Sequence, residues 1–416
     1  MSTARTADLV LDLNGQNERV NRLYTHLTFC FSHSDDSSYD ASTIEQLLRT
    51  ALNTLRSALP WIGGRVVKRE QDGLYAIRIP NRADGLPQDR LTVNEELDLN
   101  FDDLRACGFP ASLLHEDRLA PCSTFLADIP EDGAPVFLIK AVLVKGGLLL
   151  TLAAQHGSMD MTGGNRIQTS ADQLQPTIAP QTSRDHAGPS AAPDPAPAWT
   201  TFRLPATALT TIKASATKDI TSGFISTDDT ITALVWQAIT RATTHHHNPA
   251  EQDTTLMQTT LSRNVDLRPA LHLLAPESIM NQPLGRTAQS LRTALDSEKL
   301  VEQFDAQAEE FCGARDNQPI PKQPPATDRN STGRTLQVRV SSWATYTKVH
   351  EFEFGLGLGP PVAVRRPAFR DGAREGLVYF LPKTTSRAID VMVCLRPAAL
   401  NELRELVEDH GAIWIG

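Results

Sequence analysis

The sequence predicts a mixed α/β protein of two lobes, and three observations lead to this fold class. The chain has 416 residues, which is more than one ordinary hydrophobic core holds. Stretches with the patterns of strands and helices alternate on both sides of residues 168–198. This segment is rich in Pro, Ala, Ser, Gln and Asp, which is typical of a solvated crossover loop. We therefore expect an N-terminal lobe at 1–167, a linker at 168–198 and a C-terminal lobe at 199–416, part of which (340–370) could pack with the N-terminal lobe.

The N-terminal lobe contains one clear helix and a first pair of strands. The stretch STIEQLLRTALNTLRSALP starts with a serine and a threonine that can cap a helix, and its proline ends the helix. Its apolar side chains follow at helical spacing: Leu47, Leu48, Ala51, Leu55 and Leu59. GRVVKREQDGLYAIRIP predicts two strands joined by a turn at Asp72-Gly73, and FDDLRACGFPASLLHED predicts a short helix followed by a loop.

The clearest hairpin is VFLIKAVLVKGGLLLTLAAQH. Two apolar strands, at about 136–144 and 148–155, flank Gly146-Gly147, a dipeptide that tolerates positive φ. His156 is then expected where the second strand leaves the sheet.

The C-terminal lobe alternates strands and helices. WTTFRLPATALTTIKASAT predicts a strand and then a helix. ISTDDTITALVWQAITRAT predicts a helix capped by Ser226 or Thr227, with Asp228 and Asp229 at the positive end of its dipole. TLMQTTLSRNVDLRPAL predicts a strand with a polar exit. The strand patterns LQVRVSSW, GLVYFLP and AIDVMVCL follow, and the helix pattern AALNELRELVED comes last.

Composition excludes several classes of function. The net charge is −9 and no basic tract occurs, which argues against a nucleic-acid partner. The chain has neither a signal-peptide pattern nor an apolar run long enough to span a bilayer, so we expect a cytoplasmic protein without a membrane partner. The five cysteines are widely spaced and form no CxxC pair, which predicts free thiols and no metal site. We also expect a monomer.

Chemistry is suggested by the polar cluster HGSMD that follows the hairpin. A histidine imidazole generally titrates near neutrality, so a residue such as His156 can remove a proton from a hydroxyl and return it within one turnover. Gly157 leaves room for a reactant, and Asp160 could hold either the turn or the histidine. Because HxxxD is short and common, an ordinary turn histidine with satisfied hydrogen bonds remains the alternative from this pattern alone.

Three landmarks, in order along the chain, make the sequence resemble the BAHD family of coenzyme A-dependent acyltransferases. The first is HGSMD at 156–160, the HxxxD motif. The second is SRNVDLRP at 262–269, which is similar to the family's DxR segment and contains Asp266 and Arg268. The third is SSW at 341–343 followed by EFGLGLGPP at 353–361, which is similar to the TSW and DFGWG-x-P signatures. The resemblance is strongest to a fungal branch that includes trichothecene 3-O-acetyltransferases.

The resemblance implies a two-lobed, chloramphenicol acetyltransferase-like fold and an O-acyltransferase of secondary-metabolite or mycotoxin biosynthesis. It implies acyl-CoA, expected to be acetyl-CoA, as co-substrate and a small-molecule alcohol as acceptor. His156 would be the general base, Asp160 would point away from the substrate and pair with Arg268, and Gly157 and Gly163 would border the substrate channel. No covalent acyl-enzyme is needed, since both substrates meet in one channel.

The third landmark carries further candidate residues. Ser341 is similar to a family hydroxyl residue that stabilises developing oxyanion charge, although an ordinary strand serine is an equal alternative. Trp343 would shape the pocket. The glycine run lacks the Lys-Ser/Thr of a phosphate loop, and the resemblance makes it a structural loop, in which Glu353 replaces the family's aspartate. Its further members are Gly355, Gly357 and Gly359.

The sequence also allows two other functions, and it does not assign the residues that contact the coenzyme phosphates. A trimmed channel could promote a cyclisation or rearrangement without coenzyme A, or the chain could bind a metabolite without catalysis. Coenzyme phosphates require local positive charge in an acidic protein. The sequence does not choose among the candidates Arg203, Lys213, Arg365 and Arg366.

Overall fold

The computed structural model describes residues 8–12, 14–33, 40–81, 85, 87–159, 196–245, 258–264, 270–271, 283–294, 335–352 and 358–416. The chain forms two compact units. The N-terminal unit comprises residues 1–182, 345–373 and 415–416, and the C-terminal unit comprises 183–344 and 374–414. Most of the predicted linker lies outside the described residues, and its last residue, Ala198, is the first residue of a strand.

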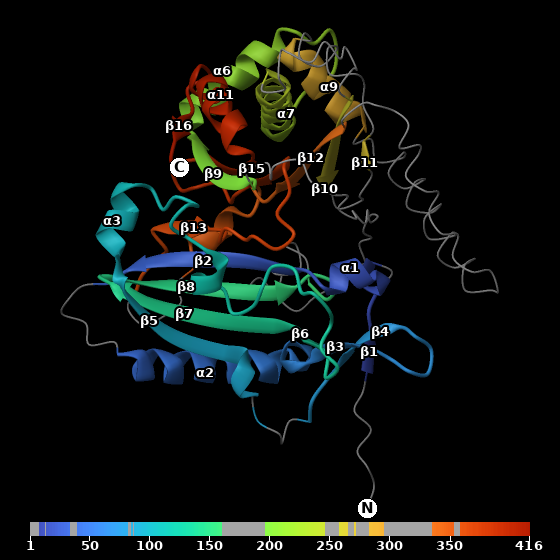
Figure 1. The fold of residues 1–416 in the computed structure, drawn as a ribbon, viewed down its shortest axis with the longest axis vertical. Helices are drawn as coiled ribbons and strands as arrows, with labels where there is room; N and C mark the ends of the chain where they lie inside the picture. The colour runs from blue at the N-terminus through green and yellow to red at the C-terminus, as the bar shows by residue number, and fades with distance from the viewer. Residues whose placement is uncertain are drawn as a thin grey trace, which may run out of the picture. The chain divides into compact units, whose positions relative to one another are not determined.

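The N-terminal unit contains two sheets, the long helix α2 (Ala41–Ala58) and several short helices (Figure 1). Its strands are β1 (Asp8–Val10), β2 (Tyr24–Ser32), β3 (Arg65–Lys68), β4 (Tyr75–Arg78), β5 (Leu91–Asn100), β6 (Ala134–Pro135), β7 (Phe137–Lys145), β8 (Gly147–Gln155) and β13 (Ala363–Arg365). Its α-helices are α1 (Glu18–Asn21), α2 (Ala41–Ala58), α3 (Phe101–Ala106) and α4 (Glu116–Leu119). Short 3-10 helices lie at Asn14–Gln16, Pro60–Gly63, Gln88–Arg90 and Thr347–His350.

The larger sheet of this unit contains the predicted hairpin. Its strand order is β13-β2-β8-β7-β5, and β7 and β8 pair antiparallel around Gly146, whose φ of 79° is one that glycine adopts without strain. The second glycine of the predicted turn, Gly147, belongs to β8 instead, because it pairs with Val144. The hairpin is thereby confirmed with a tighter turn than expected. β13 pairs antiparallel with β2, so a segment from late in the chain completes the edge of this sheet.

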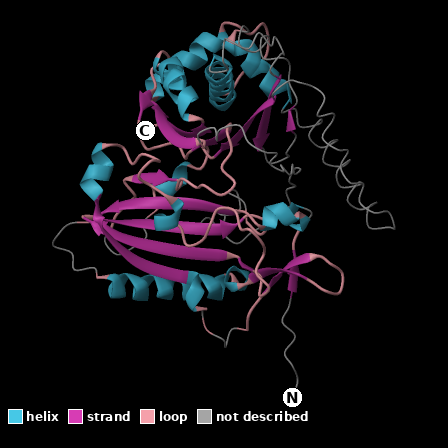
Figure 2. Ribbon diagram, in the orientation of Figure 1, coloured by secondary structure: helices cyan, strands magenta, loops and turns pink. Residues whose placement is uncertain are grey.

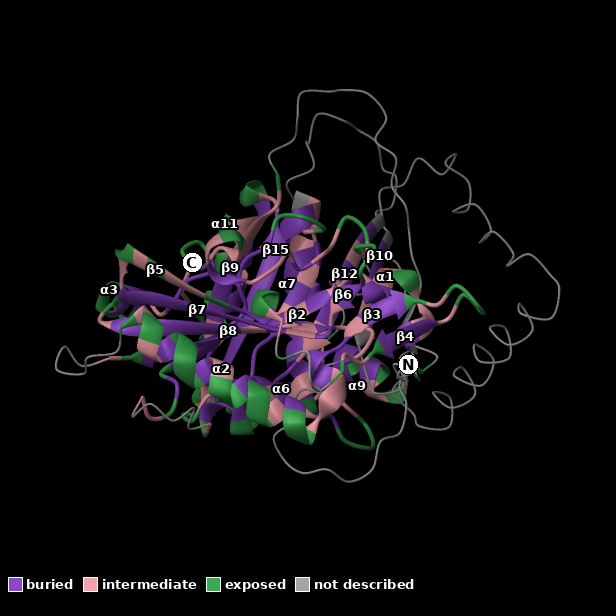
Figure 3. Ribbon diagram, turned by 90° about the horizontal axis from the view of Figure 1, so that it is seen from below, coloured by how far each residue is buried: buried purple, intermediate pink, exposed green. Residues whose placement is uncertain are grey.

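Helix α2 covers one face of the larger sheet (Figure 2), and its cap differs from the prediction. Asp40 caps it, since its carboxylate accepts a hydrogen bond of 2.8 Å from the Thr43 N–H. The serine and threonine expected to cap therefore lie inside the first turn. The buried residues of this helix are Ile44, Leu48, Leu52 and Arg56, and they form one stripe. Figure 3 shows that α2 carries both exposed and buried residues. Leu47 and Ala51 are exposed, because the stripe follows one set of i+4 positions only.

The smaller sheet has the order β1-β4-β3-β6. The predicted pairing of β3 with β4 is confirmed, with Lys68 opposite Tyr75. Gly73, at the turn between them, has a φ of 69°, which explains why a glycine occupies this position.

The C-terminal unit is one seven-stranded sheet with helices packed against it (Figure 1). Its strands are β9 (Ala198–Leu204), β10 (Gln258–Asn264), β11 (Ala270–Leu271), β12 (Thr335–Ser342), β14 (Leu377–Phe380), β15 (Ile389–Leu395) and β16 (Ile413–Trp414). Its helices are α6 (Ala206–Thr217), α7 (Thr227–His245), α9 (Leu284–Ala294) and α11 (Pro397–Glu408). The strand order is β11-β10-β12-β14-β15-β9-β16, with both parallel and antiparallel pairs.

One hydrophobic core joins the helices of this unit to one face of its sheet. Phe202, Val338, Phe380 and Val391 project from four strands into the core that also contains Trp236 of α7. The cap of α7 was predicted correctly, because the Ser226 hydroxyl accepts a hydrogen bond of 3.1 Å from the Asp229 N–H. The structure confirms the mixed α/β class. No helix of the described part of the chain is both long enough and apolar enough to cross a bilayer.

Candidate active site

His156 lies directly after the last residue of β8, as the sequence predicts. Its N–H donates a hydrogen bond of 2.8 Å to the Leu23 carbonyl oxygen, which continues the pairing of β8 with β2 by one residue. Its imidazole is half-buried, and Nδ1 lies 3.2 Å from the Thr25 hydroxyl. Two neighbouring strands therefore fix both the backbone and the ring of this histidine.

The turn after His156 is held by Gln155 and Asn21, which were not predicted as site residues. The fully buried Gln155 amide donates to the Asn21 carbonyl oxygen at 2.8 Å and accepts from the Ser158 N–H at 2.8 Å. The Ser158 hydroxyl donates to the Gln155 carbonyl oxygen at 2.9 Å. Because buried polar groups need partners, this network specifies the path of the chain from Gln155 to Ser158.

Gly157 fits against the side chain of Asn21. A Cβ at this position would overlap the Asn21 side-chain oxygen, and Asn21 is itself buried and donates to the Gly15 carbonyl oxygen at 2.7 Å. The glycine is thus required by a close approach within the fold, in addition to any room it leaves for a reactant.

We expect Gly157→Ala to lower the free energy of unfolding of the N-terminal unit by roughly 1–3 kcal/mol, because the new methyl group displaces a hydrogen-bonded side chain. Urea titration monitored by fluorescence measures the loss. In the double variant with Asn21→Ala the obstructing oxygen is gone, so the combined loss should be smaller than the sum of the two single losses. Strict additivity would show that Asn21 is not the obstacle.

A second histidine, His26, lies beside Thr25 in β2 and is a poor candidate for the base. Its side chain is fully buried, with Nδ1 3.2 Å from the Thr124 hydroxyl and 3.6 Å from a Glu116 carboxylate oxygen. Burial, with a smaller contribution from the positive charge of Arg366, holds the pKa of His26 well below its usual value. His26 is therefore a neutral structural residue, and His156 is the histidine placed at the strand end.

Ser341 and Trp343 lie together in the C-terminal unit, at the end of β12. Ser341 pairs with Tyr379 of β14, whose ring centroid is 5.3 Å from that of the buried Trp343. The next residue, Ser342, donates a hydrogen bond of 2.7 Å to a carboxylate oxygen of Asp228 at the start of α7. Since side chains alternate along a strand, Ser341 faces away from α7.

Most other predicted site residues lie outside the described residues. These are Asp160, Gly163, Asp266, Arg268, Glu353, Gly355 and Gly357. Gly359 is described and has a φ of 65°, a value typical of a tight loop.

Three of the four candidate contacts to the coenzyme phosphates are already engaged within the protein. Arg365 is buried and donates to the carbonyl oxygens of Gly108 at 2.9 Å and Phe109 at 3.2 Å. Arg366 is also buried, 3.5 Å from the Thr124 hydroxyl. Arg203 binds Asp390 through two hydrogen bonds of 2.6 and 2.9 Å. The fourth, Lys213 of α6, is half-buried.

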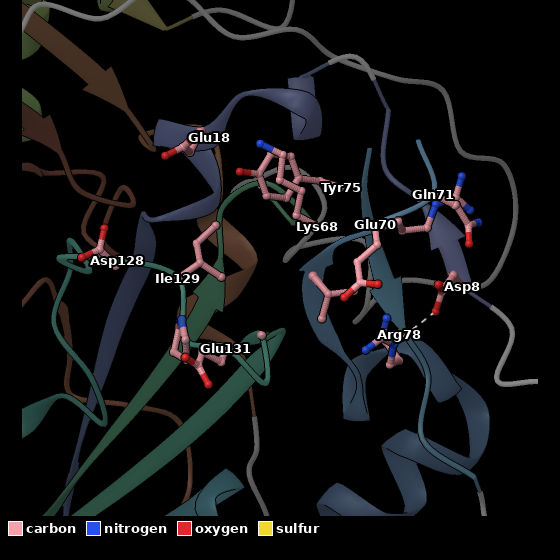
Figure 4. Close-up of a pocket in the computed structure, with 14 residues that line it drawn as sticks. Asp8, Glu18, Lys68, Glu70, Gln71, Tyr75, Arg78, Asp128, Ile129 and Glu131 are labelled. Atoms are coloured by element: carbon pink, nitrogen blue, oxygen red, sulfur yellow. Dashed lines mark ion pairs between the residues drawn. The ribbon is translucent and has the colours of Figure 1, made fainter. Parts of the chain in front are cut away.

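A cavity of about 620 Å³ in the N-terminal unit lies elsewhere, against the smaller sheet (Figure 4). Charged side chains dominate its lining, among them Glu18, Lys68, Glu70 and Glu131, and Asp8 forms an ion pair of 3.6 Å with Arg78. Its lining includes none of the predicted site residues. Among the described residues, no group of three His, Cys, Asp or Glu side chains is arranged to hold a metal ion.

Comparison with known proteins gives matches over most of the chain. Residues 23–173 match the family model of the trichothecene 3-O-acetyltransferase-like N-terminal domain, and residues 196–410 match the Transferase family. An O-acetyltransferase of Cryptosporiopsis sp. is 31% identical over 95% of this chain and 94% of its own length. The trichothecene 3-O-acetyltransferase TRI101 of Fusarium sporotrichioides is 30% identical over 97% of this chain and 96% of its own length.

Solved structures agree with these matches. The crystal structure of F. sporotrichioides TRI101 complexed with coenzyme A and T-2 has a TM-score of 0.78 and 30% identity, and the match covers 99% of this chain and 100% of that one. Vinorine synthase, at 12% identity and a TM-score of 0.62, shares the fold. The two-lobed fold and the family predicted from the HxxxD, DxR-like and SSW landmarks are confirmed. The chain belongs to the Transferase family, in its trichothecene 3-O-acetyltransferase-like branch, and is an O-acyltransferase.

Proposed function

We propose that this protein transfers an acetyl group from acetyl-CoA to a hydroxyl group of a fungal secondary metabolite, with His156 as the general base. The observation that carries the proposal is the placement of the imidazole. It stands half-buried at the end of β8, with its backbone bound to Leu23 and Nδ1 beside the Thr25 hydroxyl. A base held in this way can meet a substrate through its other ring nitrogen, Nε2.

The reaction needs one base and two bound substrates. Nε2 accepts the hydroxyl proton while the alcohol oxygen attacks the thioester carbonyl carbon. The carbon–sulfur bond then breaks, and the same proton passes from His156 to the departing thiolate, so that an acetyl ester and coenzyme A leave. Holding both substrates together supplies much of the rate enhancement, and no covalent enzyme intermediate is required.

One further predicted residue has a supporting role in this proposal. The Ser341 hydroxyl donates a hydrogen bond to the oxygen on which negative charge develops. Its orientation away from α7, on the sheet face it shares with Tyr379, is compatible with this role.

The acceptor is expected to be a polycyclic alcohol of the trichothecene type. This expectation follows from relatives that are named trichothecene 3-O-acetyltransferases and from the complexes of Fusarium graminearum TRI101 with deoxynivalenol and with T-2 mycotoxin. Eremophilane alcohols are the next class to consider, because two eremophilane O-acetyltransferases also match this chain, over 36% of its length.

The test is a direct assay of the purified protein. With acetyl-CoA and deoxynivalenol or a panel of hydroxylated sesquiterpenoids and polyketides, we expect alcohol-dependent release of free thiol and a product heavier by one acetyl group. Acetyl-CoA should also raise the thermal midpoint of unfolding, because it binds the folded protein only. If acetyl-CoA causes no thermal shift and no thiol is released, the chain does not use this co-substrate and the proposal fails.

A further inference from the structure

We propose that Thr25 is a positioning residue for His156. Its hydroxyl oxygen accepts a hydrogen bond from Nδ1–H and so holds the imidazole in the tautomer whose Nε2 carries no proton. This inference rests on the proposed function, in which Nε2 removes the proton of the acceptor alcohol. It adds a residue on β2, far from the HxxxD motif in sequence, to the machinery of the reaction.

The contact between the two side chains is fixed by pairing between β2 and β8. Thr25 lies opposite Ala154, and His156 follows two residues later, with its N–H bonded to the Leu23 carbonyl oxygen at 2.8 Å. The two side chains are therefore diagonal neighbours on one face of the sheet, where cross-strand pairs interact. The distance of 3.2 Å between Thr25 Oγ1 and Nδ1 agrees with this arrangement.

Two features restrict the motion of the threonine itself. Its β-branched side chain has few rotamers in a strand, so the hydroxyl position is set largely by the backbone. The neighbouring residue His26 projects from the opposite face of β2 and is fully buried, with Nδ1 3.2 Å from the Thr124 hydroxyl. This contact restrains the segment of β2 that carries Thr25, and the fixed hydroxyl in turn restrains the ring of His156.

The direction of the hydrogen bond decides what the imidazole can do. In a neutral imidazole one nitrogen carries the proton and the other accepts. If Nδ1–H donates to Thr25, Nε2 is the nitrogen without a proton and can act as a base. If the threonine instead donates to Nδ1, the proton is on Nε2 and the ring begins the reaction unable to accept one there.

A threonine acceptor also suits the charged form of the ring. When Nε2 takes the alcohol proton, Nδ1–H still donates to the same oxygen, and the bond becomes charge-assisted and stronger. The interaction therefore stabilises the state that develops during the reaction more than the resting state, which is the requirement for a contribution to rate. The expected signature is a change in kcat with little change in KM.

The first measurement is made on the unaltered protein. In ¹⁵N-histidine-labelled protein, the His156 resonances, assigned by comparison with His156→Gln, should be those of a ring with the proton on Nδ1. A resting ring with its proton on Nε2 would overturn the proposal without any variant at Thr25.

The second measurement is kinetic. Thr25→Val keeps the shape and strand propensity and removes the oxygen, and we expect kcat to fall roughly 10- to 100-fold, the loss of one hydrogen bond to a charged group. KM for both substrates should stay within about two-fold, because no substrate contact is lost. Thr25→Ser restores the hydroxyl and should recover most of kcat. A Thr25→Val enzyme with unchanged kcat would overturn the proposal.

Thr28→Val is the matched control. Thr28 lies in the same strand and forms a hydrogen bond of 2.8 Å with Thr151, on the face of β2 opposite Thr25, so this variant should keep its kcat. A loss of kcat as large as that of Thr25→Val would make both effects general consequences of damage to β2. If His156→Ala is inactive while Thr25→Val is fully active, only the positioning role of Thr25 is refuted. If His156→Ala is fully active, the proposed function is refuted as well.

Discussion

His156→Ala is expected to lower acetyl-CoA-dependent esterification by about 10²- to 10⁴-fold, the usual contribution of a positioned general base. Without the imidazole, the alcohol must attack while still carrying its proton, and no group takes that proton in the transition state. The rate of thiol release at saturating substrates measures the loss. Binding of acetyl-CoA should persist, because the base acts on the acceptor hydroxyl.

The control for this variant is His115→Ala. His115 is also a half-buried histidine of the N-terminal unit, and it precedes α4 without capping it through its side chain. Its replacement should leave the rate unchanged. A His156→Ala enzyme that keeps more than about a tenth of the activity would exclude general-base catalysis by this residue.

Arg365→Met is expected to lower the free energy of unfolding of the N-terminal unit by about 2–4 kcal/mol. Arg365 is only 3% exposed, and its guanidinium donates to the carbonyl oxygens of Gly108 and Phe109. The variant leaves these two acceptors without their charged donor. Urea denaturation of the purified variant measures the loss. In the protein that remains folded, KM for acetyl-CoA should be unchanged.

Arg105→Met is the matched control for Arg365→Met. Arg105 belongs to the same unit, but its side chain is 45% exposed and its ion pair with Asp102 spans 3.4 Å at the surface. Exposed pairs of this kind contribute about 0.2–1 kcal/mol, so this variant should be nearly as stable as the original protein. If Arg365→Met instead kept full stability and raised KM for acetyl-CoA, Arg365 would be a coenzyme contact and its structural role would be refuted.

Local sequence patterns were sufficient to predict the two strands of the hairpin that precedes His156. The apolar runs of β7 and β8 and the glycine between them specify a hairpin without help from distant residues, and the histidine follows the second run directly. The helix α7 was predicted for a similar reason, since Ser226 and the acidic residues after it mark its start. In both cases the decisive residues lie within a few positions of one another.

The strand β2 was not predicted, although it carries Thr25. Its sequence YTHLTFCFS has aromatic and β-branched residues, which favour a strand, but its polar residues His26 and Thr28 are buried. Their partners, Thr124 and Thr151, are 98 and 123 positions away. A polar residue satisfied by so distant a partner leaves no local pattern that marks its burial.

The same reason explains why the sequence did not reveal which residues hold the turn after His156 or which groups the arginines contact. Spacing directed attention to Asp160, whereas among the described residues the turn is held by Gln155 and Asn21, which are 134 positions apart. The charge of Arg365 made it one candidate for a coenzyme contact, whereas its described partners include main-chain carbonyls 256 and 257 positions earlier. Which partner a polar side chain finds depends on the folded chain, and the sequence alone does not reveal it.

The late strand β13 has a consequence for how the protein is made. It pairs with β2 from residues 363–365, so the first 182 residues leave the ribosome before the edge of their own sheet can be covered. During this interval β2 presents unpaired N–H and C=O groups, to which another nascent chain could add. The chain must therefore be translated as far as β13 before this nascent protein is protected from aggregation at that edge.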